Sequence, residues 1–470
     1  MATDIMSVAR NTIPNASGNG ALVFKILNGT NRAYDDTQIY WAVLGMSNNR
    51  WNYLDRSGQL HPISMALNDA PGHLSKNGAN YANIYTRVSE VDWVNLPKIV
   101  SGRMFLSVGS PCFIKTHDNG FAGPDLNNSS DPNRDVYHDF IEFTIDNSGY
   151  HGNTTRVDAF GFPIQHRLVN RSGNFDLTFG ELENETRDGL FAKFRHEVPE
   201  EFKTLAEIQA PYRIVAPIHG SFAPGKKNDK YFDAYSNNKY TTQQILLCNG
   251  PLAQEPEIGS ALNRHVFRGN TKDVTQYYKS SPANYYAKFW HDHSIGQLAY
   301  GFAYDDYNGQ ASYLEIGDPK ALIIRIGWNE SVGASGSRIP TGVIALRSNA
   351  NGKFVCAENA GNSSLIANRD AASSWETFEL ISLDGNNVAL KSRANGKYVC
   401  AENAGDGPLI ANRSQVSSWE TFRLIDRGNG KVALIAVNGK YVCADDFGNS
   451  ELIANRTSVD SWETFDLTQQ

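Results

Sequence analysis

The chain has 470 residues, of which 41% are hydrophobic and 20% are charged, a composition typical of a globular protein with more than one domain. Its net charge of -7 and pI of 5.9 argue against a nucleic-acid partner, because such a partner favours a basic face. No run of about 20 apolar residues is present, so no membrane-spanning segment is expected.

The cysteines do not form a disulfide pattern. They are odd in number and widely spaced, at Cys112, Cys248, Cys356, Cys400 and Cys443. Free thiols are therefore expected, although the sequence leaves open a pair between Cys112 and Cys248. The amino terminus, Met-Ala-Thr-Asp-Ile-Met, lacks the basic and apolar regions of a signal peptide, so either the protein is cytoplasmic or a leader has been removed.

Short apolar runs between turn residues dominate the chain as far as Leu182. Examples are Ala21–Leu27, Gln38–Leu44 and Gly102–Val108. This spacing predicts an all-β sandwich or barrel. A long polar loop at residues 121–134 lies between predicted strands, where binding surfaces are often found.

Two further runs, Phe140–Ile145 and Thr154–Phe160, flank a segment rich in Asn, Ser and Gly, which predicts a hairpin. Folding about Tyr150 would place Glu142 opposite Asp158 on one face of the ladder. Facing like charges destabilise a sheet by up to about 1 kcal/mol, so such a pair indicates a function. Hydrolysis of a glycosidic bond needs two carboxylates, one as an acid and one to activate water or attack. The alternative is that Glu142 faces solvent and Asp158 caps a turn.

In the middle of the chain, the spacing of the apolar residues becomes helical in several segments. The segments Thr186–His196, Pro199–Glu207 and Gln276–His291 favour helices. The segments Arg213–Ile218 and Gln244–Cys248 favour strands. A mixed α/β region is therefore expected after the first strands.

The sequence gives little support for a metal site or a cofactor site. His291 and His293 could share a face and bind a metal, but a third ligand at a recognisable spacing is missing, so no metal is expected. The sequence has no phosphate-binding glycine-rich loop and no nucleophile elbow. No cofactor is expected.

The last part of the chain repeats three times. The motif Asn-Gly-Lys-Phe/Tyr-Val-Cys-Ala begins at Asn351, Asn395 and Asn438, and each copy is followed by Leu-Ile-Ala-Asn-Arg and Trp-Glu-Thr-Phe. Three units long enough for four short strands predict a β-trefoil over residues 343–470, after a small-residue linker at 329–342. The Cys, the Trp and the Phe of each unit are expected in the core, because a shared core requires fixed placement in every repeat.

Six motifs in the first part resemble glycoside hydrolase family 64, the thaumatin-like endo-β-1,3-glucanases. They occur in the family's order within residues 1–328: Phe105–Pro111, Asp118–Pro124, Asp131–Asn133, Asp139–Phe143, Val157–Gly161 and Tyr304–Gln310. The resemblance implies a β-barrel and a mixed region with a wide cleft between them, and the carboxylates on the floor of that cleft.

The same resemblance implies an inverting mechanism. Glu142 matches the general acid and Asp158 the general base, which predicts carboxyl groups about 6.5 to 9.5 Å apart. Arg156 could help keep Asp158 ionised. Three aromatic residues could cover Glu142 and favour its protonated form: Phe140, Phe143 and Phe160.

Further positions match substrate-binding residues of the family. Thr144 and Thr155 match cleft threonines that flank the scissile bond. Asp146 and His151 stand where the family has Asn and Trp, so the neighbouring subsite is expected to differ. Three acids in matched motifs are expected either to bind sugar hydroxyls or to cap loops: Asp131, Asp305 and Asp306.

Residues 343–470 resemble the fascin-like trefoils of carbohydrate-binding module family 56, which binds β-1,3-glucan. Because trefoils also bind proteins, a protein-interaction module is an alternative. The polar pair after each Cys-Ala is the candidate for sugar contact, with turn formation as an equal alternative. These pairs are Glu358 and Asn359, Glu402 and Asn403, and Asp445 and Asp446.

Together these inferences predict a mainly β, multidomain protein. The expected parts are a thaumatin-like β-barrel at 1–185, a mixed α/β part with return strands at 186–328, the linker at 329–342 and the β-trefoil at 343–470. The expected function is a secreted, inverting endo-β-1,3-glucanase that releases pentamers from long β-1,3-glucan. Its partner would be the glucan, without nucleic acid or membrane, and the protein would be a monomer. A non-catalytic glucan-binding lectin is the alternative.

Overall fold

A computed structural model describes residues 4–470 except 32, 330–341, 384–386, 429–430 and 457–458. The chain folds into two compact units, one mainly of Thr12–Arg171 and Thr178–Ser331, the other mainly of Val332–Gln470. Nearly all of the predicted linker at 329–342 lies outside the described residues. Among the helices that are described, none is both long and apolar enough to cross a membrane.

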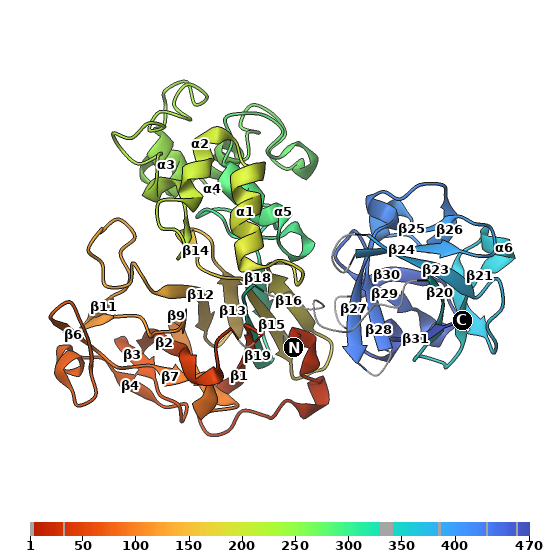
Figure 1. The fold of residues 1–470 in the computed structure, drawn as a ribbon, viewed down its shortest axis with the longest axis horizontal. Coiled ribbons are helices and arrows are strands. Elements are labelled where there is room, and N and C mark those ends of the chain that lie inside the picture. The colour runs from red at the N-terminus through yellow and green to blue at the C-terminus, as the bar shows by residue number, and fades with distance from the viewer. Residues whose placement is uncertain (1–3, 32, 330–341, 384–386, 429–430, 457–458) are drawn as a thin grey trace. The chain divides into compact units, whose positions relative to one another are not determined.

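The first unit contains two large β-sheets (Figure 1). The eight-stranded sheet consists, in spatial order, of β18 (Tyr313–Ile316), β13 (Tyr150–Thr154), β12 (Tyr137–Ile145), β9 (Ile99–Val108), β2 (Ile39–Ser47), β3 (Arg50–Leu54) and β4 (Leu60–Pro62), with β7 (Thr86–Arg87) beside β2. The five-stranded sheet consists of β16 (Asp176–Gly180), β15 (Ile164–Asn170), β19 (Pro319–Gly327), β1 (Gly20–Gly29) and β8 (Val94–Pro97). Short pairs add β5 (Leu74–Lys76) with β6 (Ala79–Tyr81), β10 (Lys115–His117) with β11 (Gly120–Ala122), and β14 (Ala159–Phe160) with β17 (Ile214–Val215).

An apolar core joins the two sheets. Phe24 of β1 and Trp41 of β2 are both 1% exposed, and their rings meet edge to face with centroids 5.0 Å apart. Burying large aromatic side chains is a main source of stability in such a core. The strands predicted at Ala21–Leu27, Gln38–Leu44 and Gly102–Val108 are confirmed as parts of β1, β2 and β9.

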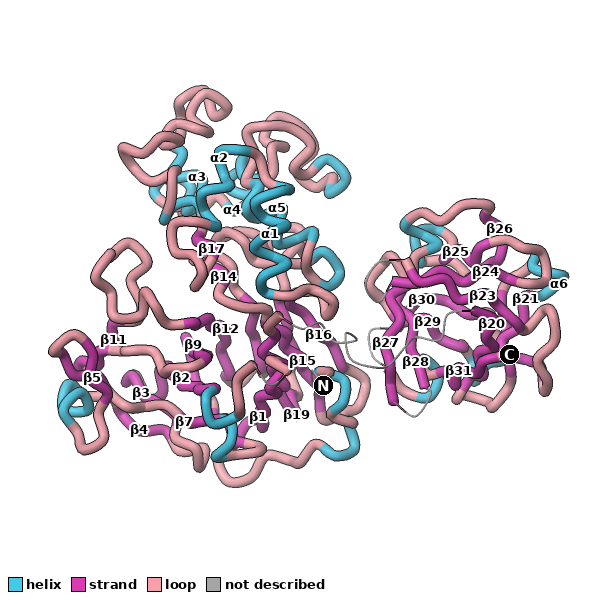
Figure 2. The backbone as a smooth tube through the Cα atoms, in the orientation of Figure 1, coloured by secondary structure: helices cyan, strands magenta, loops and turns pink. Residues whose placement is uncertain are grey.

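The α-helices of the first unit come from the middle of the sequence and lie close together in space (Figure 2). They are α1 (Arg187–Glu197), α2 (Glu200–Lys203), α3 (Thr242–Leu247), α4 (Pro256–Asn263) and α5 (Tyr285–Asp292). The predicted helix at Thr186–His196 is confirmed as α1, whose N-cap Thr186 accepts the N–H of Gly189. The predicted strand at Gln244–Cys248 is wrong, because the capping box of Thr241 and Gln244 starts α3 there.

The second unit is a β-trefoil. Six strands pair in a closed ring: β20 (Gly342–Ser348), β23 (Thr377–Ser382), β24 (Asn387–Ser392), β27 (Phe422–Gly428), β28 (Lys431–Ile435) and β31 (Phe465–Gln469). Each repeat adds one hairpin: β21 (Phe354–Ala357) with β22 (Leu365–Arg369), β25 (Tyr398–Ala401) with β26 (Leu409–Arg413), and β29 (Tyr441–Ala444) with β30 (Leu452–Arg456). A short helix, α6 (Glu358–Gly361), follows β21.

The core of the trefoil contains part of what the repeats predict. All five cysteines of the protein are free and buried, including the one in each repeat. The repeat phenylalanines Phe378, Phe422 and Phe465 are completely buried. The prediction is wrong for the tryptophans, because Trp375 is 37% exposed, Trp419 is 36% exposed and Trp462 is partly exposed. A side chain at the same place in every repeat can therefore belong to the surface.

Candidate active site

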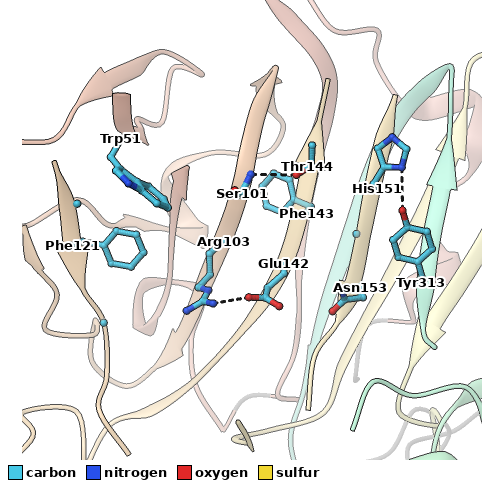
Figure 3. Close-up of a pocket in the computed structure, with 14 residues that line it drawn as sticks. Trp51, Ser101, Arg103, Phe121, Glu142, Phe143, Thr144, His151, Asn153 and Tyr313 are labelled. Atoms are coloured by element: carbon cyan, nitrogen blue, oxygen red, sulfur yellow. Dashed lines mark hydrogen bonds and ion pairs between the residues drawn. The ribbon is translucent and has the colours of Figure 1, made fainter. Parts of the chain in front are cut away.

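Strand β12 presents the first candidate carboxylate to an open cavity. Its side chains alternate, so that Ile141 and Ile145 are buried whereas Glu142 and Thr144 are partly exposed. The exposed face borders a cavity of about 710 Å³ (Figure 3). Side chains around this cavity include Trp51, Ser101, Arg103, Phe121, Glu142, Thr144, His151, Asn153 and Tyr313.

Glu142 is held by the strands on both sides. Its ladder partners are Arg103 in β9 and Asn153 in β13. Nη2 of Arg103 donates a hydrogen bond to Oε1 of Glu142 at 2.6 Å, and the same guanidinium lies 4.3 Å from the centre of the Phe140 ring. Opposite charges across a ladder stabilise the sheet. The Glu142 side chain remains 40% exposed, so its free oxygen can reach a ligand in the cavity.

The apolar cover expected around Glu142 is mostly absent. Only Phe140 shares its face, since strand alternation turns Phe143 the other way, where it stacks on Tyr150 with ring centres 6.0 Å apart. Phe160 is fully buried in the helical core and stacks on Trp290 at 4.6 Å. The prediction is therefore wrong for Phe143 and Phe160.

The hairpin does not have the predicted register. The chain turns at Asp146–Gly149, where the N–H of Asp146 donates to the carbonyl of Gly149 at 3.0 Å. Glu142 consequently faces Asn153 and not Asp158. The physical reason is local, because the Asp146 side chain also accepts the N–H of Ser148 at 2.8 Å and fixes a tight turn.

Asp158 lies in the turn between β13 and β14. Its carbonyl accepts the N–H of Ala216 at 2.9 Å, and its side chain is 48% exposed with Oδ1 3.7 Å from Nε2 of His219. It borders a second cavity, of about 270 Å³. Arg103 and Gly123 line both cavities, so the two carboxylates border adjoining cavities although they are not ladder partners.

Arg156 belongs to the scaffold beneath this turn. Its guanidinium is buried and donates to Glu181 at 2.7 Å and to Asp139 at 3.0 Å. Burial alone would lower the pKa of Arg156, but Asp139 and Glu181 raise it. Burial raises the pKa of Asp139 to about 6. The prediction that Arg156 helps keep Asp158 ionised is wrong, because these two buried acids occupy its donors.

The two predicted cleft threonines differ in position. Thr144 lines the larger cavity, and its Oγ1 accepts the N–H of Ser101 at 3.2 Å. Thr155 is 2% exposed and accepts the N–H of Val157 at 3.3 Å. It therefore shapes the turn that carries Asp158, and a direct contact with sugar is not supported for it.

Asp146 and His151 flank the same end of the hairpin. Hydrogen bonds from the Ser148 hydroxyl and N–H lower the pKa of Asp146. His151 lines the larger cavity, with Nδ1 3.1 Å from the hydroxyl of Tyr313 (Figure 3). Its Nε2 lies 2.7 Å from the Ser148 hydroxyl. The flat ring of His151 is thus held in place at the edge of the cavity, whereas the Asp146 carboxylate accepts hydrogen bonds within the turn.

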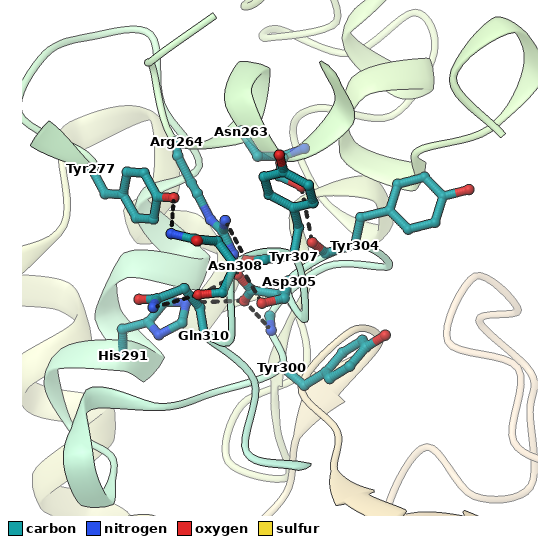
Figure 4. Close-up of polar contacts among 12 residues, drawn as sticks. Asn263, Arg264, Tyr277, His291, Tyr300, Tyr304, Asp305, Tyr307, Asn308 and Gln310 are labelled. Atoms are coloured by element: carbon teal, nitrogen blue, oxygen red, sulfur yellow. Dashed lines mark hydrogen bonds and ion pairs between the residues drawn. The ribbon is translucent and has the colours of Figure 1, made fainter. Parts of the chain in front are cut away.

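Asp305 supports the helical region and does not face the cleft. It is completely buried and accepts hydrogen bonds from Arg264, from His291 and from the N–H of Gly301 (Figure 4). Burial alone would raise the pKa of Asp305, but His291 and Arg264 lower it. Its predicted contact with sugar is wrong for this reason. Asp306, the next residue, is exposed.

The remaining acid of the matched motifs caps a loop. Asp131 accepts the N–H of Asp125 at 2.9 Å and the N–H of Asn133 at 2.7 Å. Both oxygens of its carboxylate are therefore used inside the long loop that borders the cleft. Of the two roles predicted for Asp131, the structure supports capping.

The candidate acids of the trefoil pair with their own repeats. Glu358 accepts hydrogen bonds from Asn368 and Arg369, and the equivalent contacts join Glu402 and Asp445 to the Asn and Arg of their repeats. The next residue has a left-handed backbone in each repeat, with φ of 51° at Asn359, 52° at Asn403 and 47° at Asp446. Turn formation, the alternative to sugar contact, is thus the role that these contacts support.

Several cleft residues were missed from the sequence. Trp51 and Phe121 meet edge to face with ring centres 5.2 Å apart, and Tyr313 is 40% exposed beside His151. Arg103 and His219 contact the two candidate carboxylates. Strand alternation in β9 could have indicated Arg103, but the other four come from distant segments, so no local pattern could group them.

Comparisons with known proteins agree on one family. The family model described as Beta-1,3-glucanase, glycoside hydrolase family 64, matches residues 20–251 and 236–326. A laminaripentaose-producing β-1,3-glucanase of this family from Paenibacillus barengoltzii, solved with laminarihexaose, is 59% identical, with 70% of this chain and 80% of that chain covered and a TM-score of 0.68. A β-1,3-glucanase domain from Clostridium beijerinckii is 34% identical, with 67% of this chain and 100% of that chain covered and a TM-score of 0.63.

More distant relatives carry a matching name. Glucan endo-1,3-beta-glucosidase from Arthrobacter sp. (strain YCWD3) is 24% identical over 384 residues, which are 66% of this chain and 68% of the relative. The protein of the same name from Cellulosimicrobium cellulans gives the same values. A model for a domain of unknown function matches residues 382–431, within the trefoil.

Two exposed carboxylates in an aromatic-lined cleft, on a fold shared with such relatives, define a glycoside hydrolase. The chain belongs to glycoside hydrolase family 64, the β-1,3-glucanases. The prediction of an enzyme is confirmed over the alternative of a non-catalytic lectin. The likeness of residues 343–470 to carbohydrate-binding module family 56 stays a prediction.

Proposed function

We propose that this enzyme cleaves long β-1,3-glucan within the chain and with inversion at the anomeric carbon. The observation that carries the proposal is the placement of Glu142 and Asp158 on two adjoining cavities, with 40% and 48% of their side chains exposed. Exposed oxygens without a full set of protein partners are available to a substrate. β-1,3-Glucan is the substrate named for the relatives in the same family.

Glu142 acts as the general acid. In its protonated form it donates to the glycosidic oxygen while the bond between that oxygen and the anomeric carbon breaks, so that the leaving chain departs as an alcohol. The proton transfer leaves a carboxylate on Glu142. The guanidinium of Arg103, 2.6 Å from Oε1, stabilises that new charge and keeps the side chain oriented.

Asp158 acts as the general base. It takes a proton from a water molecule, and the oxygen of that water attacks the anomeric carbon from the face opposite the leaving group. Room for the water requires carboxyl groups about 6.5 to 9.5 Å apart. His219, 3.7 Å from Oδ1, restricts the orientation of the base. Proton exchange with solvent then restores the protonated acid and the ionised base.

The same proposal covers product, anchoring and location. The product is a pentamer, as it is for the laminaripentaose-producing relative from Paenibacillus barengoltzii. Residues 343–470 bind the polymer and raise the local concentration of substrate at the cleft. Because a long glucan is an extracellular substrate, we place the enzyme outside the cell, where it acts as a monomer.

The decisive experiment follows the anomer released from laminarin by NMR in real time. We expect the α-anomer first, and we expect Glu142→Gln and Asp158→Asn to be inactive while they still bind glucan. Glu315→Gln, at an exposed acid near His151, is the matched control and should keep its activity. If the β-anomer appears first, one carboxylate is a nucleophile and the inverting mechanism is wrong.

A further inference from the structure

The repeat tryptophans of the trefoil lie in turns that buried side chains stabilise by hydrogen bonds. In each repeat the Glu after the Trp folds back and accepts the N–H of the residue that opens the turn, at 2.9, 2.9 and 2.8 Å. These glutamates, Glu376, Glu420 and Glu463, are only 3% to 4% exposed. Because the Glu points inward, the Trp before it is left on the surface in a fixed position.

The third repeat differs from the other two at one position. The left-handed turn contains Ala360 in the first repeat and Ala404 in the second, but Phe447 in the third, with φ of 52°, 54° and 55°. A bulky residue is strained at such angles, and alanine forms the same turn twice. The fold therefore does not require the phenylalanine.

Phe447 completes a pair of rings on the surface. Its side chain is 61% exposed, the most exposed large hydrophobic residue among those described, and its ring centre lies 4.7 Å from that of Trp462 at an angle of 63°. Exposed apolar surface that is rimmed by polar residues is a mark of a binding site. The alanines of the other repeats provide no second ring beside Trp375 and Trp419.

Polar groups border the two rings. The guanidinium of Arg456 lies 5.7 Å from the centre of the Trp462 ring, and it donates to Asp445 at 2.6 Å. Asp446, beside Phe447, is exposed. Apolar faces next to charged donors and acceptors suit a pyranose ring, which has C–H groups on its faces and hydroxyls around its edge.

We propose that Phe447 and Trp462 form the principal glucan-binding site of the trefoil, on which glucose rings of a β-1,3-glucan stack. The other two turns, with one ring each, contribute weaker sites. The inference rests on the proposed binding of polymer by residues 343–470, and it assigns that binding to one repeat. The ligand follows from the reaction of the same chain, whose cleft acts on a β-1,3-glucan.

The test measures depletion of the intact chain by insoluble β-1,3-glucan, with Glu142→Gln in every variant so that the polymer is not digested. We expect Trp462→Ala to raise the Kd about tenfold and Phe447→Ala about fivefold, because a central aromatic contact contributes on this scale. Ala404→Phe should lower the Kd, since it places a second ring beside Trp419. Val437→Ala, which removes another exposed apolar side chain of the trefoil, is the control and should change nothing.

Phe447→Ala is a safe substitution for the fold, because alanine already occupies this turn in two repeats. In a chain that keeps Glu142, the same trefoil variants should hydrolyse short soluble oligosaccharides at the parent rate. If Phe447→Ala and Trp462→Ala both keep the parent Kd, the assignment to the third repeat is wrong. The double variant Trp375→Ala, Trp419→Ala then separates two failures. If this variant binds insoluble glucan more weakly than the parent, the trefoil still binds glucan, but through the other two repeats. If its Kd is also unchanged, the proposal that the trefoil binds glucan loses its support.

Discussion

Acids in the cleft differ from acids in the trefoil in how many protein groups they bind. Among the described residues, the Glu142 side chain has one close partner, Arg103, and the Asp158 side chain has only the imidazole of His219 at 3.7 Å. Glu402 in the trefoil, by contrast, receives both Asn412 and Arg413. Exposure and unused oxygens, not the presence of a carboxylate in a shared motif, therefore distinguish a reacting acid from a structural one.

Asp305 gives the same lesson inside the catalytic unit. It lies in a motif that resembles the family's, next to exposed Asp306, yet it is buried among Arg264, His291 and the N–H of Gly301. A carboxylate in this position neutralises buried cations. The comparison can be broken by substitutions that affect either activity or stability but should not affect both.

The largest effect is expected at the base. Asp158→Asn should lower kcat about 1,000-fold, the size typical for loss of a positioned acid or base, while the melting temperature stays at the wild-type value. Steady-state kinetics on laminarin and thermal unfolding measure the two quantities. A large fall in the melting temperature would show that Asp158 is a structural acid.

Asp305→Ala should affect stability, in contrast to Asp158→Asn, which should affect kcat. Loss of the carboxylate leaves Arg264 and His291 buried without a counter-charge, and we expect the free energy of unfolding to fall by about 3 to 5 kcal/mol. Denaturant titration measures it. Asp306→Ala is the matched control, because this neighbour is exposed, and it should change the same quantity by less than about 0.5 kcal/mol.

A buried histidine makes the stability of the catalytic unit depend on pH. His293 lies 2.7 Å from Glu185 and 2.8 Å from Glu197. Burial alone would lower the pKa of His293, but the two carboxylates raise it above its ordinary value of 6.5. The folded state therefore holds this proton more tightly than the unfolded state does.

Its contribution to stability is complete below the unfolded pKa and is lost as the pH rises through the higher folded pKa. We expect the melting temperature to fall as the pH rises above about 6.5, with a smaller slope in His293→Gln. Thermal unfolding over this range tests the prediction. An equal slope in both proteins would assign the pH dependence to other groups.

The smallest effect is expected at the paired acids of the trefoil. Glu402→Gln keeps a group that can accept from Asn412 but loses the ion pair with Arg413, which is 37% exposed, so the free energy of unfolding should fall by about 0.5 kcal/mol. Denaturant titration and binding to insoluble glucan are both needed. A clear loss of glucan binding at wild-type stability would make Glu402 a ligand and contradict the comparison.

Much of the architecture follows from the sequence alone. Alternation and turn residues determine strands such as β1, β2 and β9, and helical spacing determines α1. These signals are local, because burial of one face imposes a period on consecutive residues. Repetition likewise determines the trefoil, since three equal units have to share one core.

The tertiary structure decided which groups meet. The turn at Asp146–Gly149 sets the register that separates Glu142 from Asp158, and folding brings His219 to Asp158 from a distant segment. The position of a residue in the repeat does not distinguish core from surface. Trp375 is exposed because the next residue, Glu376, points inward and accepts a hydrogen bond there. Sequence determines periodic, local features of this protein, whereas the partners and exposure of a side chain depend on segments that only the fold brings together.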